Sequence, residues 1–171
     1  MADRIAVGLA TWFYSSLIGP GTLGSAAAIP LCYVAVQIPW DGGMGAVYYA
    51  AIAAVIFLLG LWCIPRAQVF LGPRVDGHGI VKDRDQGQIV IDEVLGMLIT
   101  TSPFIVFPPA APEWLAYGLA FIFFRVFDIA KPPPVKYFDR MKSAAGVMLD
   151  DVAAGAWGAL VMLLLRLADC W

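Results

Sequence analysis

The chain has 171 residues, of which 61% are hydrophobic and 14% are charged. An ordinary soluble domain contains roughly 45–50% apolar and about 25% charged residues. With a mean hydropathy of +0.79, the composition therefore predicts an integral membrane protein whose partner is the bilayer. We expect one domain, residues 1–171. The formal net charge of −2 says little by itself, and we expect no nucleic-acid partner.

The cysteines and the N-terminus argue against a disulfide-rich protein, a zinc-binding protein and a cleaved signal peptide. Cys32, Cys63 and Cys170 are far apart and form no C-x-x-C pair, which argues against a disulfide framework and a zinc site. The N-terminal apolar run is interrupted by polar and aromatic residues and lacks a small-x-small cleavage site, so it is interpreted as mature sequence rather than a signal peptide.

The sequence predicts helices throughout. An interfacial or short re-entrant helix is predicted for residues 5–18. Residues 22–39 are apolar and rich in small side chains, and predict a span kinked at Pro30. The clearest span is residues 43–64, which carry no charge and are long enough to cross about 30 Å of hydrocarbon.

Three later stretches are apolar but contain charged residues: 89–107, 113–130 and 147–168. Together the segments predict an all-α fold, a polytopic helical membrane bundle of four to five spanning helices plus an N-terminal interfacial helix. Basic residues gather in residues 65–88 and 131–146, whereas the PPAAP turn at 108–112 has none. The positive-inside rule predicts that both basic loops are cytoplasmic and that this turn is external.

In the three stretches 89–107, 113–130 and 147–168, the acidic residues are predicted to lie at the same depth in the membrane, near the cytoplasmic surface. Carboxylates within apolar helices are costly, about 2.5–3.5 kcal/mol each at the helix centre and less near an interface. Several together repel one another unless they share a cation, and oxygen ligands favour Mg²⁺, Mn²⁺ or Ca²⁺ over zinc. This pattern predicts a divalent cation and a phosphate-bearing substrate. The acids are Asp92, Glu93, Asp128, Asp150 and Asp151, with Arg125 and Lys131 nearby.

Simpler interpretations stay open at this point. Arg125 and Asp128 are three residues apart, which also suits an internal ion pair between helices. Asp150 and Asp151 also suit a solvated helix start. Glu93 lies about 100° around the helix from Asp92, so the two need not face one site.

The segment GPGTLGS, residues 19–25, precedes the second apolar stretch. Free N–H groups at a helix start and flanking hydroxyls suit a phosphate, but the segment also suits an ordinary turn and N-cap. Cysteine and phosphohistidine phosphatases are excluded, because no cysteine has an arginine six residues later and His78 is the only histidine. We interpret His78 as a solvated loop residue. DRDQG at 83–87 lacks the preceding strand of an aspartyl-phosphate motif.

Four segments occur in a fixed order across residues 19–158: GPGTLGS, IVIDEVLGM, FRVFDIAKPPPVKYFDR and AGVMLDDVAAG. They resemble the phosphatidylglycerophosphatase A family, Mg²⁺-dependent bacterial enzymes that remove the terminal phosphate from phosphatidylglycerophosphate. The resemblance implies a lipid substrate, a role in phospholipid biosynthesis, and an inner-membrane protein whose active site faces the cytoplasm. The alternative of a small cation-coupled transporter is disfavoured by the uncharged span 43–64 and by the one-sided depth of the acids. A non-catalytic scaffold would not require an arginine and a lysine among the acids.

The resemblance also implies roles for individual residues. Catalysis and metal binding fall to Asp92, Glu93, Asp128, Asp150 and Asp151, and phosphate binding to Thr22, Gly24, Ser25, Arg125, Lys131 and Arg140. Gly96, Pro132 and Asp139 also match. The sequence departs from the family pattern near Ala144, where a glycine is expected, so the turn before the last motif is predicted to differ.

Overall fold

The computed structural model describes residues 2–12, 20–37, 44–72, 74–75, 81–82, 88–110 and 112–169. Within them the fold is helical, as predicted, with one short antiparallel hairpin of two-residue strands, β1 (Arg74–Val75) and β2 (Val81–Lys82). The helices are α1 (Ala2–Ala10), α2 (Pro20–Gln37), α3 (Gly45–Leu71), α4 (Ile91–Thr100), α5 (Pro103–Val106), α6 (Glu113–Ala130), α7 (Val135–Asp139) and α8 (Ala144–Leu167).

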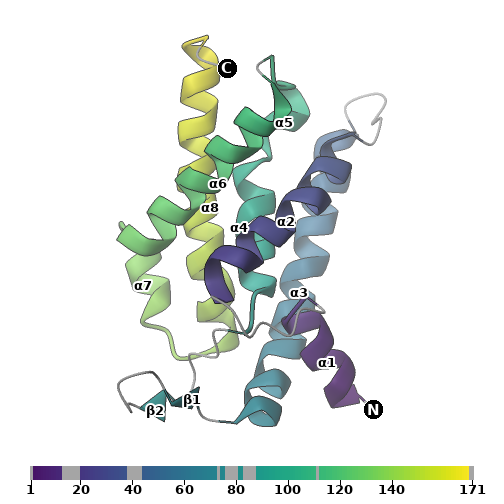
Figure 1. Ribbon diagram of the computed structural model, residues 1–171, viewed down its shortest axis with the longest axis vertical. Coiled ribbons are helices and arrows are strands. Elements are labelled where there is room, and N and C mark those ends of the chain that lie inside the picture. Colours follow the sequence, from purple (N-terminus) through teal and green to yellow (C-terminus); the bar gives the residue numbers. More distant parts are fainter. Residues whose placement is uncertain are drawn as a thin grey trace.

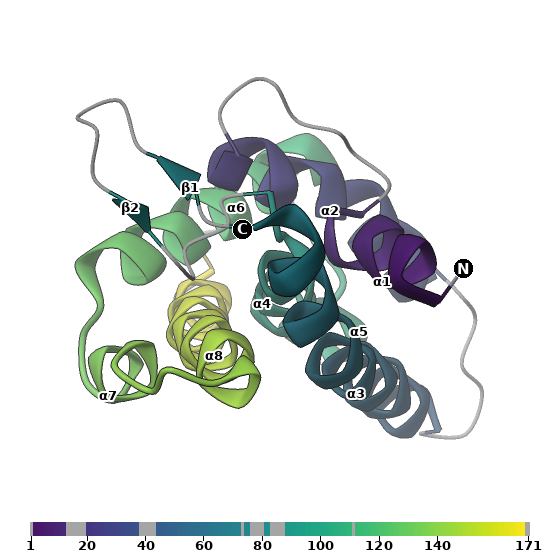
Figure 2. The ribbon, with the colours of Figure 1, turned by 90° about the horizontal axis from the view of Figure 1, so that it is seen from below.

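Helix α4 occupies the middle of the bundle and packs against α8, α2 and α3 (Figure 2). Helix α1 packs on α3, and α7 packs on α8. In Figure 1 the strands β1 and β2, between α3 and α4, and the α7–α8 connection lie toward one end of the molecule, and α5 lies toward the other end. The described parts of the two basic stretches, 65–88 and 131–146, therefore lie toward the same end.

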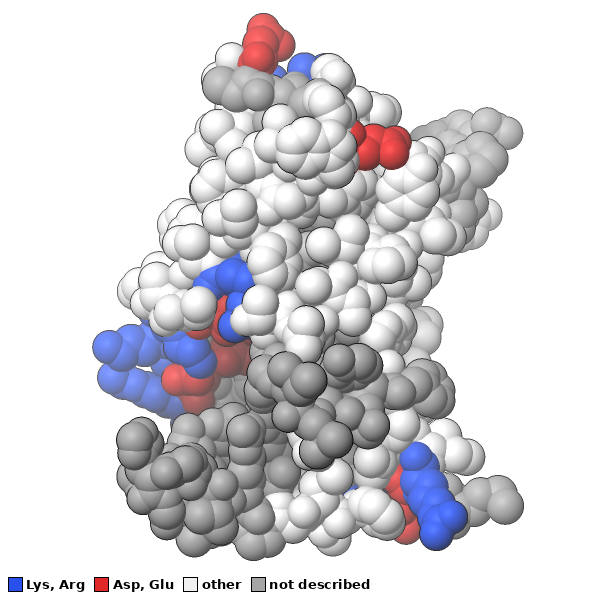
Figure 3. All heavy atoms as spheres, in the orientation of Figure 1, with Lys and Arg blue, Asp and Glu red and all other residues white. Residues whose placement is uncertain are grey.

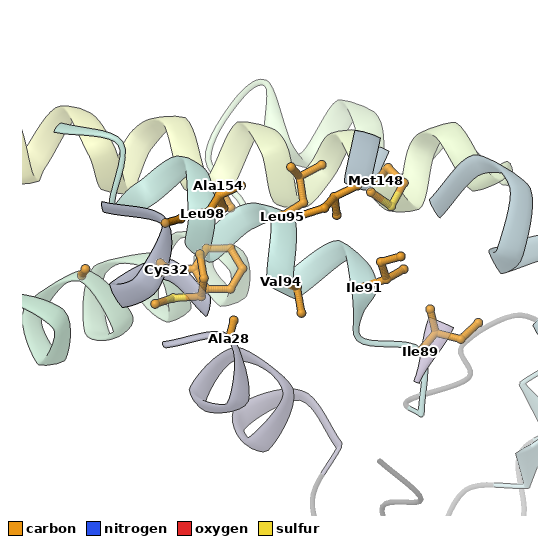
Figure 4. Close-up of a cluster of buried hydrophobic side chains, with 14 of the residues drawn as sticks. Ala28, Cys32, Ile89, Ile91, Val94, Leu95, Leu98, Met148 and Ala154 are labelled. Atoms are coloured by element: carbon orange, nitrogen blue, oxygen red, sulfur yellow. The ribbon is translucent and has the colours of Figure 1, made fainter. Parts of the chain in front are cut away.

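Small residues bring α4 and α8 into close contact. A Cβ on Gly155 would lie 2.5 Å from the carbonyl oxygen of Gly96, and one on Gly158 would lie 2.8 Å from Cγ2 of Thr100. Figure 4 shows the apolar side chains of α4 between α8 and α2, with Met148 on one side and Ala28 on the other. This close packing sets the start of α4 beside the aspartates of α8.

The predicted span at 89–107 is not a continuous helix. Helix α4 has 10 residues, about 15 Å of helix, and a turn at Thr101 and Ser102 separates it from α5. Pro103 lacks an N–H group and restricts the residue before it, which ends the helix. The hydroxyl of Tyr49 donates a hydrogen bond of 2.7 Å to the carbonyl of Leu98, so the end of α4 keeps a buried partner.

Two other predicted boundaries were wrong. Helix α3 continues through Pro65 to Leu71, although the sequence suggested an end at Ile64. Arg66 turns back on this helix: its Nη1 donates to the Trp62 carbonyl at 2.7 Å, and its guanidinium lies over the Trp62 ring. These contacts hold the Arg66 side chain along the helix just beyond Pro65.

Helix α8 begins at Ala144, three residues before the predicted start, because Ser143 caps it by accepting a 3.1 Å hydrogen bond from Gly146 N. Ala144 takes an ordinary helical position as the first residue of α8, and the predicted difference from the family's turn stays a prediction. Asp150 and Asp151 consequently lie in the second turn of α8 rather than the first.

Two helices, α3 and α8, are long and apolar enough to cross a membrane, judged by length and composition. The first predicted helix, 5–18, is found as α1 from Ala2 to Ala10, while residues 13–19 lie outside the described residues. Helix α2 contains Pro30, as predicted, and α6 has the predicted bounds.

Candidate active site

Three helices bring the five predicted acids together. Asp92 and Glu93 lie in the first turn of α4, Asp128 in the last turn of α6, and Asp150 and Asp151 in the second turn of α8. Asp92 interacts electrostatically with Asp150 and Asp128, and Asp151 interacts with the other four acids. The structure thus forms one acidic cluster at the end of the bundle that holds the basic loops.

Glu93 sits in a buried network on the α2 side of this cluster. The hydroxyl of Ser25 donates a 2.9 Å hydrogen bond to Oε2 of Glu93. Nη1 of Arg125 lies 3.6 Å from Oε1 of Glu93, 2.7 Å from Oδ2 of Asp128 and 3.5 Å from the Ser25 hydroxyl. Arg125 therefore links α2, α4 and α6, and the ion pair with Asp128 that the sequence left open is present.

Gly24 allows the close approach on which this network depends. A Cβ at this position would lie 2.6 Å from Oε2 of Glu93 and 2.6 Å from a methyl carbon of Val90. Gly24 and Ser25, which the resemblance assigned to phosphate binding, lie against Glu93 in this structure.

Lys131 ends α6 in a left-handed conformation, with φ of 47°, and its N–H donates to the Phe127 carbonyl at 2.9 Å. Its ammonium group forms a hydrogen bond with Asp139 and lies 3.4 Å from Oδ2 of Asp150. Partial burial alone would lower the pKa of Lys131, but Asp139 and Asp150 raise it above its ordinary value. Lys131 is therefore a permanent cation beside α8.

Asp151 is 4% exposed, so the interpretation of this residue as a solvated helix start is wrong. Within the described part of the chain, its carboxylate has no recorded ion pair or hydrogen bond. Oδ1 of Asp150 accepts from the Asp151 N–H at 3.1 Å, and Oδ1 of Asp92 accepts from the Glu93 N–H at 3.0 Å. The negative charge of the cluster is thus only partly balanced by Arg125 and Lys131.

Other predicted residues lie apart from the cluster. Thr22 is exposed near the start of α2, and Arg140 is exposed directly after α7. No ion pair of Arg140 is found among the described residues. Cys32 and Cys63 are buried free thiols, as expected. His78, residues 83–87 and Cys170 lie outside the described residues.

The cluster fits a hard divalent cation by its chemistry. All of its ligand atoms are carboxylate oxygens, the type that Mg²⁺ and Ca²⁺ prefer, and it carries an excess of negative charge. Among the described residues, no three acidic, histidine or cysteine side chains converge into a metal-binding group as they stand. Asp128 and Asp150 are engaged by Arg125 and Lys131, while no ion pair from the described residues holds Asp92 or Asp151.

The surface around the cluster is polar, in contrast to much of the visible face. Figure 3 shows basic and acidic atoms gathered over the end of α6 and over α7, beside a largely uncharged upper body.

Sequence reasoning missed one residue near this patch, Trp157. Its indole N–H donates to the Pro133 carbonyl at 3.1 Å, and its ring stacks on Phe127. A tryptophan in an apolar helix gives no signal of this contact in the sequence.

Comparison with known proteins yields consistent matches. The family profile described as phosphatidylglycerophosphatase A matches residues 8–166. Phosphatidylglycerophosphatase A of Escherichia coli is 36% identical over 160 residues, which cover 90% of this chain and 79% of that protein. The protein of the same name from Haemophilus influenzae is 31% identical over 161 residues, covering 92% and 86%.

A more distant relative carries a different description. A putative phosphatidylinositol-3-phosphatase of Bacteroides thetaiotaomicron is 29% identical over 118 residues, which cover 68% of this chain and 65% of that protein. No solved structure matches the chain.

Proposed function

Because the chain belongs to the phosphatidylglycerophosphatase A family, we propose that it hydrolyses the terminal phosphate of phosphatidylglycerophosphate by a metal-assisted mechanism. The products are phosphatidylglycerol and inorganic phosphate. The observation that carries the proposal is the acidic cluster, in which carboxylates from α4, α6 and α8 lie beside Arg125 and Lys131.

Asp92, Asp128, Asp150 and Asp151 would hold Mg²⁺. When bound, the ion neutralises the charge of the phosphate and lowers the pKa of a water molecule. Glu93, the fifth acid expected to act as a ligand, is engaged by Ser25 and Arg125, and in this proposal it orients Arg125.

The two cations of the cluster would bind the phosphoryl group. Arg125 is held on one side by Glu93 and Asp128, which leaves its other N–H groups available for phosphate oxygens. Lys131 approaches from the α7 side. Cations fixed on two sides of the transferred group stabilise the charge that spreads over its oxygens in the transition state.

Asp92 and Asp151, which form no ion pair with the described residues, are the candidates for two alternative roles. One of them accepts a proton from the attacking water, or one attacks phosphorus and forms a phospho-aspartate. Rapid acid quenching followed by mass spectrometry distinguishes the routes, because only the second leaves a phosphorylated aspartate.

The proposed location is the bacterial inner membrane, with the acidic cluster at the cytoplasmic surface. The positive-inside rule supports this orientation, since the segment that follows α6 carries Lys131, Lys136, Arg140 and Lys142. Helices α3 and α8 would cross the bilayer, and α2, α6 and the α4–α5 pair would complete four to five segments. A cation-coupled transporter has no support, because the described charges gather at helix ends and the first twenty residues of α3 carry none.

The test is phosphate release by the detergent-purified protein, with Mg²⁺ and with EDTA. The substrates are phosphatidylglycerophosphate, a phosphatidylinositol 3-phosphate lipid, and soluble glycerol phosphate. We expect release that requires both the metal and the first lipid. Equal release from glycerol phosphate would contradict a lipid-directed site, and full activity in EDTA would contradict the metal.

A further inference from the structure

The turn after α6, residues 131–134, is attached to α8 at two levels. At the first level, Nζ of Lys131 lies 3.4 Å from Oδ2 of Asp150. At the second, Nε1 of Trp157 donates a 3.1 Å hydrogen bond to the carbonyl of Pro133. The indole also stacks on the ring of Phe127, with centroids 5.9 Å apart and planes 27° apart.

Both attachments come from one face of α8. Asp150 and Trp157 are seven residues apart, which is about two helical turns, so their side chains project in nearly the same direction about 10 Å apart. Phe127 serves twice in this arrangement, because its ring stacks on Trp157 and its carbonyl accepts from the Lys131 N–H.

The turn has few backbone donors of its own. It contains three consecutive prolines, which have no N–H groups to donate, and Lys131 adopts a left-handed conformation that is unfavourable for a residue with a Cβ. The lysine side chain is flexible and loses entropy when it is held. The Pro134 carbonyl accepts from the N–H groups of Tyr137 and Phe138, so α7 holds one end of the turn. Among the described residues, Trp157 is the side chain that donates to the middle of the turn, at the Pro133 carbonyl.

We propose that Trp157 is a positioning residue for Lys131: it holds the 131–134 turn and the end of α6 against α8, so that the ammonium group stays directed at Asp150. The catalytic consequence of this contact rests on the proposed phosphatase function. Among the described residues, Trp157 has no hydrogen bond or ion pair with the acidic cluster. It acts on Lys131 through its contacts with Phe127 and Pro133.

The first test is kinetic. Trp157→Leu removes the stack and the hydrogen bond, and Trp157→Phe keeps a ring but loses the donor. We expect kcat for phosphatidylglycerophosphate to fall by about tenfold to about a hundredfold in the leucine variant, and less in the phenylalanine variant, because small displacements of a catalytic group have effects of this size. Trp114→Leu, at the exposed start of α6, is the matched control and keeps wild-type kcat.

A double-mutant cycle shows whether the effect passes through the lysine. In a Lys131→Ala background, Trp157→Leu should lower kcat by less than about twofold, because the group that it positions is gone. A full additional loss, with the two effects multiplying, would overturn the proposal.

The second test does not depend on activity. The purified protein is labelled with an amine-reactive reagent, and modification of Lys131 and Lys136 is quantified by peptide mass spectrometry. Trp157→Leu should increase Lys131 labelling several-fold and leave exposed Lys136 unchanged. Unchanged Lys131 labelling would overturn the inference even in an active enzyme. Wild-type protein without phosphatase activity would instead overturn the proposed function, and the labelling would still decide the role of Trp157.

Discussion

The two membrane-length helices, α3 and α8, differ in what surrounds them. The first twenty residues of α3 carry no charge, and apolar side chains such as Val55 and Leu58 are more than half exposed. Helix α8 carries Asp150 and Asp151 near its start and packs closely against α4 through Gly155 and Gly158. The difference fits the proposed function, in which α3 would lie against lipid and α8 would carry two of the proposed metal ligands.

The comparison also shows how an apolar helix accommodates charge. Asp150 and Asp151 are surrounded by protein, because α4, α6 and α7 pack around α8. Lys131, directly after α6, forms an ion pair with Asp150. Charged side chains inside membranes are generally found facing such a protein interior. Altering the two helices in turn should therefore affect different properties.

The largest effect is expected from Asp151→Asn and Asp150→Asn. Each variant keeps the shape of the side chain and removes a negative charge, so we expect phosphate release to fall by at least about a hundredfold with thermal stability in detergent nearly unchanged. Asp169→Asn, in the exposed turn after α8, is the matched control and should retain full activity. Near-normal activity in both site variants would remove these aspartates from the mechanism.

A second prediction concerns the contact between α8 and α4. Gly155→Ala places a methyl group 2.5 Å from the Gly96 carbonyl oxygen, so the backbones must separate. We expect the free energy of unfolding in detergent to fall by about 1–3 kcal/mol. Gly118→Ala, on α6 where a Cβ meets nothing within 4 Å, should be neutral or slightly stabilising. Equal effects of the two substitutions would contradict the close contact.

Much of this division was visible in the sequence. The uncharged stretch of α3 and the bounds of α6 follow from composition and from the prolines that flank α6. The end of α3 was not visible in the sequence, because a proline usually ends or kinks a helix and no local pattern signals that α3 continues through Pro65 to Leu71. The break after α4 was signalled by Pro103, but the apolar run around it concealed the signal.

That the five acids lie close together was also predictable from the sequence, because their segments place them at one depth. The side chains that pair with these acids could not be predicted. That Ser25 faces Glu93 and not solvent depends on how closely α2 approaches α4 at Gly24, which is a tertiary property. The contact of Trp157 with Pro133 likewise joins two segments whose proximity no local pattern indicates.

A third prediction separates the roles of the basic residues. In Arg125→Lys the single ammonium group can pair with Asp128 but cannot also present a planar set of donors to phosphate. We expect kcat/KM to fall by about tenfold. Arg166→Lys, near the C-terminal end of α8 and paired with exposed Asp169, serves as the control and should leave kcat/KM unchanged.

The smallest effect is expected on the exposed side of α3. Leu58→Ala should change the free energy of unfolding in detergent by less than about 0.5 kcal/mol, because its side chain contacts the surrounding apolar medium. Ile64→Ala, at a fully buried position of the same helix, should cost about 2–4 kcal/mol. Similar losses at both positions would show that protein, and not lipid, covers this side of α3.

The central claim is that the acidic cluster binds a divalent cation, and Mn²⁺ binding followed by electron paramagnetic resonance tests it most directly. We expect the signal of free Mn²⁺ to decrease when wild-type protein or Asp169→Asn is added. Asp151→Asn should bind Mn²⁺ at least about tenfold more weakly, because a buried ligand is lost. Binding by Asp151→Asn equal to that of the wild-type protein would contradict the account.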